Sequence, residues 1–482
     1  MNNMKYKIIS RTPSIIWLDG KEIEEKIDTN YNNASFIEGI DRKYSKIDFK
    51  ISLNEDIIEE LTDYTANGSF AWLKENVIYS LNEGVPFIKI KNLTDNGFDF
   101  SNLEYITSDT YLKLKKSQLK GGELLFSKTG TIGVTVVVPK NCGEVSVADN
   151  IFRIVYKSNI DVHYIDAFYK SKYGKMWVER LSQGGVQQTI IKDSFRKIKI
   201  PIPPYEVQKY IGDKAREAEE LREEVKKLKV ELEILFKRYT GLKDEEVNGE
   251  NIKNYGYVLP NDLGNMIGAE VYKPSYVENR RKIKKAGKYI NLNECYDYIV
   301  NGVDYREYLE GYGTEYYKVG SISMFGIKNK ERTFIDLQLS DISDKQKIEK
   351  GNLLITRKGS FGIAMAVTDK EEIGIISSEV FKLKVKDNWN ADYLAYFLNS
   401  EFGKKQFNQY ATGTTMKGIN QQNIIEIIVP DISYSEQREI GNLVNEIKNN
   451  INKSEKLIKE AKQNIEDLIE GNLDMSKIKE TN

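Results

Sequence analysis

The sequence predicts an α+β (mixed α/β) protein in which two similar globular domains are separated by two long antiparallel coiled-coil helices. Three observations support this fold: a long internal duplication, short β-rich runs between glycine turns in each copy, and a heptad-patterned stretch after each copy. A chain of 482 residues is also too long for one compact core, so two or more domains are expected.

The duplication is clearest in two segments that share a glycine start, an isoleucine-rich run and a proline end. GGVQQTIIKDSFRKIKIPIPP begins at Gly184 and GTTMKGINQQNIIEIIVP begins at Gly413, an offset of 229 (413 minus 184). The same offset pairs GGELLFSKTGTIG, residues 121–133, with KGNLLITRKGSFG, residues 350–362. Further upstream, ISLNE from Ile51 matches INLNE at an offset of 239 (290 minus 51). A period this long makes each copy a domain, not a short stacking repeat.

The stretches that follow the two copies are predicted to be long helices. Apolar residues recur at spacings of three and four from Ala218 to Leu235 and from Ile440 to Leu468, with one polar position at Ser454. This spacing is typical of a coiled-coil seam, which needs a partner. The other helix of the same chain, packed antiparallel, is the favoured partner. Packing of each seam on its own domain and an intermolecular coiled coil are the alternatives.

The predicted organisation follows from these elements. The parts are a first globular domain at 1–205, a central spacer helix at 206–240, a linker at 241–260, a second globular domain at 261–433 and a distal spacer helix at 434–472.

Composition narrows the function classes. The chain is 40% hydrophobic and 30% charged, as in ordered proteins, and it has no signal-like start and no window of eighteen apolar residues, so no membrane span is expected. Two cysteines suit a reducing cytoplasm. The single histidine, His163, excludes most histidine-based nucleophile and zinc sites and is expected to be a surface or packing residue. The net charge of −1 means that any DNA contact must come from local basic patches.

In the order of these segments, the chain resembles the specificity subunits of type I restriction–modification systems. The resemblance rests on the repeated segments that end in PPYEVQKYIG and SYSEQREIG, and on LLFSKTGTIG and LLITRKGSFG. AEVYKPSYVENRRKI, residues 269–283, is similar to the opening helix of a target-recognition domain of that family. The resemblance covers nearly the whole chain, although residues 14–50 match the family's domain opening less closely.

The resemblance implies a non-catalytic subunit that reads a bipartite DNA site, with one target-recognition domain on each half. The paired helices would bind two modification subunits, which carry S-adenosylmethionine and methylate adenine at N6. Restriction subunits, with ATP and Mg²⁺, would join this complex to cleave DNA. The chain itself would bind no cofactor, and its partners would be double-stranded DNA and these subunits. A stand-alone or fused-type DNA adenine methyltransferase or nuclease component, and a two-headed interaction protein that binds no DNA, are the alternatives.

Candidate DNA-contacting residues lie in glycine-flanked loops and in one basic helix. Basic, hydroxyl and amide side chains suit contact with phosphates and base edges, although plain exposed turns and a basic surface helix are the alternatives. The side chains of Lys128, Arg357 and Lys358 are expected to be exposed. The candidates are Lys128, Thr129, Gln187, Gln188, Thr189, Arg357, Lys358, Ser360, Thr414, Thr415 and Lys417, with Arg280 and Arg281 from the basic run at residues 273–288, which holds seven Lys or Arg.

Two short motifs suggest catalysis but are better explained by structure. Pro203-Pro204-Tyr205 resembles an amino-methyltransferase motif, but Ile202 stands where that motif needs a polar residue, so a helix entry is expected. Pro430-Asp431 followed by Glu446-Ile447-Lys448 resembles a nuclease pattern, but its Glu and Lys fall on the second predicted helix. No metal or catalytic site is predicted.

Overall fold

The structure, a computed structural model, describes most of the chain. The described residues are 6–11, 14–18, 31, 33–81, 83–99, 102–185, 187–243, 258, 263, 266, 268–328, 333–368, 374–413 and 417–479. Contacts divide the chain into unit 1, residues 1–222 and 453–482, and unit 2, residues 223–452. Most of the predicted linker at 241–260 lies outside the described residues, and the predicted domain boundaries stay a prediction.

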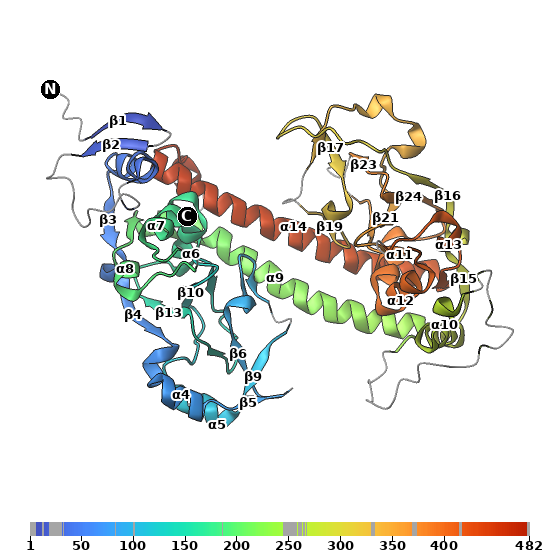
Figure 1. Ribbon diagram of the computed structural model, residues 1–482, viewed down its shortest axis with the longest axis horizontal. Helices are drawn as coiled ribbons and strands as arrows, with labels where there is room; N and C mark the ends of the chain where they lie inside the picture. The colour runs from blue at the N-terminus through green and yellow to red at the C-terminus, as the bar shows by residue number, and fades with distance from the viewer. Residues whose placement is uncertain are drawn as a thin grey trace. The chain divides into compact units, whose positions relative to one another are not determined.

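Unit 1 contains two four-stranded sheets and a set of mostly short helices (Figure 1). The central sheet has the strand order β11-β10-β13-β4 and the second sheet has the order β12-β6-β9-β5, with β14-β3, β7-β8 and β1-β2 as further pairs. The strands are β1 Tyr6–Arg11, β2 Ser14–Leu18, β3 Lys50–Leu53, β4 Ile58–Asp63, β5 Tyr79–Ser80, β6 Val85–Ile88, β7 Leu93–Thr94, β8 Gly97–Phe98, β9 Glu104–Ile106, β10 Leu124–Ser127, β11 Thr135–Val137, β12 Ser146–Val147, β13 Ile151–Tyr156 and β14 Lys199–Ile202. The helices are α1 Ala34–Phe36, α2 Arg42–Tyr44, α3 Asn54–Ile57, α4 Phe70–Asn76, α5 Ser108–Lys113, α6 Val162–Lys170, α7 Lys172–Leu181, α8 Lys192–Arg196 and α15 Ser476–Lys479, with the long helices α9 Tyr205–Thr240 and α14 Tyr434–Glu470 shared with unit 2.

Unit 2 repeats this plan in its own strands and helices. Its central sheet has the order β16-β24-β21-β22, a second sheet has the order β20-β17-β23, and β15-β25 and β18-β19 are pairs. The strands are β15 Tyr289–Asn291, β16 Tyr296–Asn301, β17 Thr314–Tyr317, β18 Ile322–Ser323, β19 Gly326–Ile327, β20 Phe334–Ile335, β21 Asn352–Thr356, β22 Ala364–Ala366, β23 Ile375–Ile376, β24 Val380–Val385 and β25 Ile428–Pro430. The helices are α10 Pro274–Ala286, α11 Ala391–Asn399, α12 Glu401–Tyr410 and α13 Gln421–Ile424.

The predicted duplication is confirmed by the strand topology. The order β11-β10-β13-β4 in unit 1 corresponds, strand for strand, to β22-β21-β24-β16 in unit 2. The second sheets agree as well, because β12 pairs parallel with β6 as β23 does with β17, and β9 pairs antiparallel with β6 as β20 does with β17. The edge strands β4 and β16 also each contain a shift in register where they pair with the neighbouring strand of the central sheet. The predicted mixed fold with two similar domains is therefore confirmed.

In both units, a side-chain hydrogen bond to the backbone joins a helix to the strand that precedes the long helix. The Tyr164 hydroxyl donates to the Pro201 carbonyl at 2.7 Å, and the Tyr393 hydroxyl donates to the Pro430 carbonyl at 2.7 Å. These buried tyrosines tie the first helix after the central sheet to the strand that leads into the long helix. A buried polar group must find a partner, so a hydroxyl paired with a strand carbonyl fixes the relative position of both elements.

A glutamine and a glycine, both shifted by 229, repeat at the start of the long helices. Gln208 accepts from the Asp161 backbone N–H and donates to the Pro203 carbonyl. Gln437 makes the two equivalent bonds in unit 2. A Cβ on Gly212 would lie 2.4 Å from the Asp161 carboxylate, so only glycine lets the long helix approach this closely.

Strand pairing corrects the register of the upstream match by one residue. Pro201 pairs with Ile51 in unit 1, whereas the equivalent Pro430 pairs with Tyr289 in unit 2. The structural offset here is therefore 238 (289 minus 51), and not the 239 that the ISLNE and INLNE segments suggest. Backbone hydrogen bonds to the partner strand set this register, and a similarity of five letters does not determine it.

The first copy also has an opening helix, although its sequence resembles that of the second copy only weakly. Residues 34–44 form one continuous helical segment, which includes a π-helical turn at Ile37–Asp41. The Trp177 indole donates to the Tyr44 hydroxyl at 3.2 Å and holds this helix against α7. In unit 2, Asn279 on α10 likewise donates to the Phe402 carbonyl of α12 at 3.0 Å.

The two long helices pack on each other antiparallel, as predicted. In unit 1, Lys214 pairs with Glu460 at 3.1 Å and Glu217 pairs with Lys453 at 2.6 Å, so residue numbers rise along α9 as they fall along α14. Ala218 of α9 is fully buried in this contact. In unit 2, the last part of α9 and the first part of α14 share one hydrophobic core with the central sheet. Each helix therefore packs on the other helix and also on the globular part of each unit.

Candidate nucleic-acid interface

The structure brings two of the predicted loops of unit 1 into direct contact. We call residues 128–133 loop A1 and residues 183–190 loop B1. The Thr129 and Thr189 hydroxyls lie 3.0 Å apart, and the Ile190 N–H donates to the Lys128 carbonyl at 2.9 Å. The Gly130 N–H donates to the Gln188 carbonyl at 3.1 Å.

All five candidates that the sequence suggested in unit 1 therefore lie in one place. These residues are Lys128, Thr129, Gln187, Gln188 and Thr189. The two glutamine side chains are exposed, so their amide groups can donate and accept hydrogen bonds outside the unit.

Local hydrogen bonds and glycines shape these loops. The Ser127 hydroxyl donates to the Thr131 carbonyl at 2.6 Å and accepts from the Val134 N–H, which closes loop A1 at the end of β10. Gly184 has a φ of +105°, and a Cβ there would lie 2.4 Å from the Gln187 carbonyl oxygen, so loop B1 needs glycine at its start. Gly413, at φ +99°, repeats this feature in unit 2.

Asp63, at the end of β4, lies where both loops of unit 1 are anchored. Its carboxylate accepts from Lys128 at 2.9 Å and from the Thr65 hydroxyl at 2.7 Å, and Lys192 lies 3.1 Å away. Burial raises the pKa of Asp63, but hydrogen bonds from Lys128 and Thr65 outweigh it and lower this pKa to about 2. The carboxylate is therefore charged at any ordinary pH.

Lys128 is less accessible than the sequence suggested. Its side chain is only 19% exposed, and its ammonium lies 5.3 Å from the Phe152 ring centre as well as in the pair with Asp63. The expectation that Lys128 is exposed is wrong, because its ammonium lies over the Phe152 ring and pairs with the buried Asp63 carboxylate.

Unit 2 carries the equivalent pair of loops. We call residues 357–362 loop A2 and residues 412–419 loop B2. The Ile419 N–H donates to the Arg357 carbonyl at 2.9 Å, and Lys358 forms an isolated bridge with Gly418. Among the candidates, the structure describes Lys358, Ser360 and Lys417 as exposed. Thr414 and Thr415 lie outside the described residues.

Arg357 is the unit 2 counterpart of Lys128 and is also partly buried. Its guanidinium lies 5.2 Å from the Phe381 ring centre and donates to the Ser378 carbonyl at 3.3 Å. The expected exposure of Arg357 is therefore wrong, whereas that of Lys358 is confirmed.

Neutral residues in unit 2 stand where Asp63 and Lys192 stand in unit 1. By strand pairing, Asn301 opposite Phe381 corresponds to Asp63 opposite Phe152. Gln421 corresponds to Lys192 at the offset of 229, and its amide donates to the Asn301 oxygen at 3.2 Å.

The sequence interpretation missed these four residues for an identifiable reason. With the offset of 239, Asp63 falls on Gly302, so its relation to Asn301 is hidden. The pairing of Lys192 with Gln421, which follows from the offset of 229, was the available signal.

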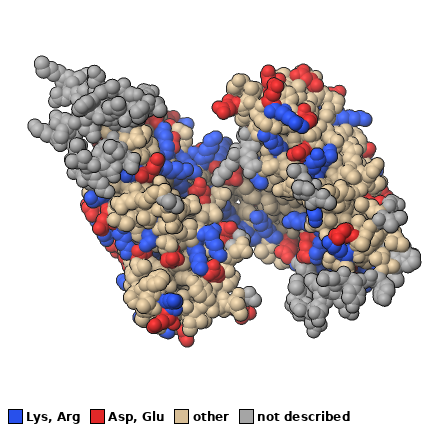
Figure 2. All heavy atoms as spheres, in the orientation of Figure 1, with Lys and Arg blue, Asp and Glu red and all other residues tan. Residues whose placement is uncertain are grey.

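The basic helix α10 has a structural role at one of its candidates. Arg280 donates to the Glu426 carbonyl at 2.7 Å, and its guanidinium lies 5.7 Å from the Tyr410 ring centre. Both contacts lie within unit 2, and they involve residues on either side of loop B2 in the chain. Arg281, next to it, is partly buried. On the face shown in Figure 2, Lys and Arg are interspersed with Asp and Glu on both units.

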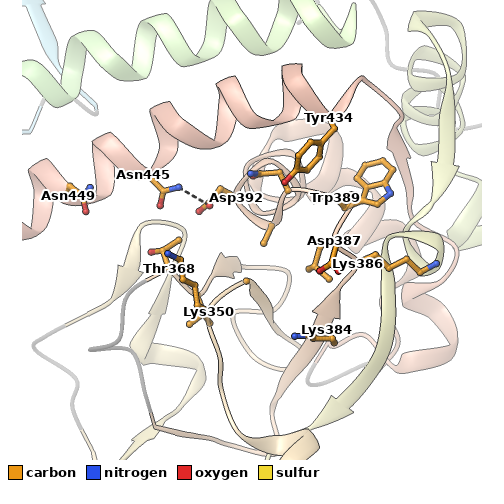
Figure 3. A pocket seen from close by; sticks show the side chains of 15 residues that line it. Lys350, Thr368, Lys384, Lys386, Asp387, Trp389, Asp392, Tyr434, Asn445 and Asn449 are labelled. Carbon is orange, nitrogen blue, oxygen red and sulfur yellow. Dashed lines mark hydrogen bonds between the residues drawn. The ribbon is translucent and has the colours of Figure 1, made fainter.

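A pocket of about 410 Å³ opens in unit 2 at the far end of the β21–β22 hairpin from loop A2 (Figure 3). Asn445 on α14 donates to Asp392 at 2.9 Å across it. In unit 1 the position of Asn445 is occupied by Arg216, which donates to Asp161 at 2.8 Å. The chemistry of the pocket is therefore not duplicated as the loops are. Its lining includes Lys350, Lys384 and Lys386.

The sequence motifs that suggested catalysis have structural roles. Pro203 and Pro204 lie at the entry to α9, where the Pro204 carbonyl accepts from the Val207 N–H at 2.9 Å, so the helix-entry interpretation is confirmed. His163 is buried on α6, which confirms a packing role. Among the residues that the structure describes, no group of three His, Cys, Asp or Glu could hold a metal ion. No helix in the described ranges is long and apolar enough to cross a membrane.

Units 1 and 2 thus present matched pairs of loops that carry different side chains on the same scaffold. Residues 58–233, which contain loops A1 and B1, match the family described as "Type I restriction modification DNA specificity domain".

Known proteins similar to this chain have the same description. The type I restriction enzyme MjaVIII specificity subunit of Methanocaldococcus jannaschii is 23% identical over 85% of this chain and 86% of that protein. A protein of the same archaeon, assigned as the MjaX specificity subunit, is 29% identical over 33% of this chain, and the match spans about a third (35%) of its length. The S subunit of a type I system from M. genitalium is 13% identical, covers 89% of this chain and 97% of that chain, and has a TM-score of 0.45.

The chain is thus similar to type I specificity subunits, and its match to the family of type I DNA specificity domains covers residues 58–233. The predicted resemblance to this family is confirmed.

Proposed function

We propose that this chain is the DNA-specificity subunit of a type I restriction–modification complex and reads a bipartite site, with unit 1 on one half and unit 2 on the other. The observation that carries the proposal is the pair of loops that both units present on the same scaffold. Loops A1 and B1 differ from loops A2 and B2 in their exposed side chains, as two readers of different half-sites must. Sequence is read by such side chains on base edges, while phosphate contacts set position.

The proposed base-reading residues are the exposed polar side chains of these loops. Gln187 and Gln188 in loop B1 suit adenine, whose N6 and N7 pair with a glutamine amide. Lys358 in loop A2 and Lys417 in loop B2 suit guanine or a phosphate. Ser360 adds an exposed hydroxyl group, the partly buried Thr129 and Thr189 hydroxyls bond to each other and can only accept from DNA, and Thr414 and Thr415 stay candidates from the sequence. Arg281 on α10 stays a candidate phosphate contact.

The chain acts in this proposal without catalytic residues or cofactors of its own. Two modification subunits, bound at the paired helices α9 and α14, would bring S-adenosylmethionine and methylate adenine at N6. Restriction subunits, where the system has them, would bring ATP and Mg²⁺. A role in reading and protecting chromosomal DNA places the complex in the cytoplasm.

Deletion of the gene in a strain with a working system tests the proposal. We expect one bipartite N6-methyladenine motif to disappear from the methylome and to return when the chain is supplied in trans. An unchanged methylome would contradict the proposal.

Variants at the loops test whether each unit reads one half-site. The double variant Q187A/Q188A should change the motif at one half-site only, and K358A/K417A at the other half-site only. Changes at both half-sites from either variant would contradict one unit per half-site. Methylation by the purified chain with S-adenosylmethionine alone would favour a stand-alone methyltransferase.

A further inference from the structure

Asp63 connects the two loops of unit 1 through two lysines that belong to different segments. Lys128 is the first residue of loop A1, and Lys192 begins α8, two residues after loop B1 ends. The Asp63 carboxylate lies 2.9 Å from the Lys128 ammonium and 3.1 Å from the Lys192 ammonium. One buried carboxylate therefore fixes the anchor of each loop.

The position of Asp63 in the fold makes this bridge rigid. Its side chain is only 6% exposed, and the backbone around it is the end of β4, an edge strand of the central sheet, where Asp63 pairs with Phe152. Thr65 adds a hydrogen bond at 2.7 Å to the oxygen that faces Lys192. A charge pair removed from water is held firmly when its remaining acceptors are satisfied.

The same bridge exists in unit 2 without the charges. Asn301 takes the place of Asp63, and Gln421 takes the place of Lys192 and donates to Asn301 at 3.2 Å. Arg357, in the place of Lys128, lies over Phe381 as Lys128 lies over Phe152, but it donates to the Ser378 carbonyl and not to Asn301. Both units thus tie the end of the edge strand to the segment behind the second loop, but only unit 1 uses a carboxylate between two cations.

We propose that Asp63 is a positioning residue for recognition by unit 1: it sets the spacing of loops A1 and B1 and keeps the Lys128 and Lys192 ammonium groups from binding DNA phosphates. In unit 2 the neutral Asn301–Gln421 hydrogen bond ties the edge strand to the segment behind loop B2 only. This inference rests on the proposed function, and it adds a determinant of specificity that touches no base.

The inference predicts a loss of discrimination together with a gain of indiscriminate binding. In D63N the two ammonium groups lose their shared anion and repel each other, so the loops separate and both cations become available to phosphates. Discrimination between the cognate duplex and one with a single changed base pair in the unit 1 half-site should fall about tenfold. Affinity for an unrelated duplex should rise, with a salt dependence steeper by up to about two phosphate contacts.

The internal duplication supplies matched controls. The double variant D63N/K192Q recreates the Asn–Gln pair of unit 2 and should restore discrimination to within about threefold of wild type, because the bridge to α8 re-forms and only Lys128 is left without its carboxylate. K192Q alone keeps the Asp63–Lys128 pair and gives Asp63 an amide donor in place of the ammonium, so discrimination should stay near wild type. N301D should disturb only the half-site that D63N leaves intact.

The experiment uses the chain in complex with its modification subunits. The recognised motif is first read from the methylome, and binding is then measured by competition against duplexes changed in one half-site, in the other, or in both. Thermal unfolding of each complex is recorded beside it. The expected result is a loss confined to one half-site for D63N and rescue by K192Q.

Two outcomes would overturn the inference while leaving the proposed function intact. In the first, D63N discriminates at both half-sites within about twofold of wild type. In the second, discrimination falls equally at both half-sites and K192Q brings no rescue, which is the signature of general destabilisation. A wild-type complex that binds no duplex selectively would instead overturn the proposed function itself.

Discussion

Units 1 and 2 share their fold but differ in the polar side chains buried in it. Arg153 on β13 and Lys382 on β24 occupy equivalent positions, 229 residues apart, and both are buried. Arg153 donates to the Glu123 carboxylate at 2.7 Å and lies 3.2 Å from Glu60. Lys382 donates to the Lys347 carbonyl, and no carboxylate within the described residues forms an ion pair with it.

The comparison teaches which parts of a duplicated fold are free to diverge. Bonds between a side chain and the backbone, such as those of Tyr164 and Tyr393, recur because both partners are fixed by the fold. Where two buried side chains bond to each other in one unit, both residues differ in the other unit. A change of only one of them would leave a buried polar group without a hydrogen-bond partner. The Asp63 and Asn301 clusters follow the second pattern, next to the loops that must differ between the units.

The largest expected difference between the units comes from removing the buried cation. R153M removes the cation from the buried Glu123 carboxylate, which keeps only the Lys120 N–H as a hydrogen-bond donor, so we expect unit 1 to lose about 3–5 kcal/mol of unfolding free energy. K382M removes a cation whose burial lowers its pKa and leaves no carboxylate behind, so unit 2 should change by less than about 1 kcal/mol or become more stable. Hydrogen exchange of β13 and β24 amides in a denaturant series measures each unit separately. Equal losses in both units would contradict this account of the two cations.

The next largest difference in stability between the units should appear in a pH series. Unit 1 buries His163 at the position where unit 2 has Asp392. Burial, and next the Arg216 cation, lower the pKa of His163 to about 4 from an ordinary value of 6.5. As the pH falls below 6.5 the unfolded chain takes up a proton that folded unit 1 does not, so stability falls until about pH 4. The difference amounts to about 3 kcal/mol. H163N should remove this part of the slope in unit 1, measured by hydrogen exchange between pH 7 and 4, and leave unit 2 unchanged.

Substitution of a closely packed helix glycine should have a smaller effect on stability, and the effect should be equal in the two units. A Cβ on Gly174 would lie 2.2 Å from the Phe168 carbonyl oxygen, and one on Gly403 would lie 2.4 Å from the Leu398 carbonyl oxygen. G174A and G403A should each cost about 1–3 kcal/mol, because backbone atoms must move. G185A, at an open position, is the control. Unequal costs in thermal unfolding would show that the two helix pairs α6–α7 and α11–α12 are not packed alike.

The smallest expected effect concerns the contact between the long helices. Lys453 and Glu217 are 58% and 46% exposed, so K453A should change stability by less than about 0.5 kcal/mol. A218L, in the buried part of the same contact, should cost about 1–3 kcal/mol by overpacking. A larger effect of K453A than of A218L would mean that charge, and not packing, holds α9 to α14.

The sequence could predict the duplication, the order of parts and the loop pairs because each leaves a local pattern. Glycines with positive φ, such as Gly184 and Gly413, are visible as letters, and the helix seams are visible as spacing. The loops could be named as candidates because they combine those glycines with polar residues. Their contact with each other follows from a sheet that the sequence does not show.

By itself, the sequence determined that this chain has two related domains, two long helices and two pairs of polar loops. Only the tertiary structure decided which residues anchor those loops. Asp63 lies 65 positions from Lys128, and its register with unit 2 depends on hydrogen bonds between strands, not on similarity of letters. Short strands carry too few residues to specify their partners, so the buried charge at the base of the loops could be found only once the strands were paired.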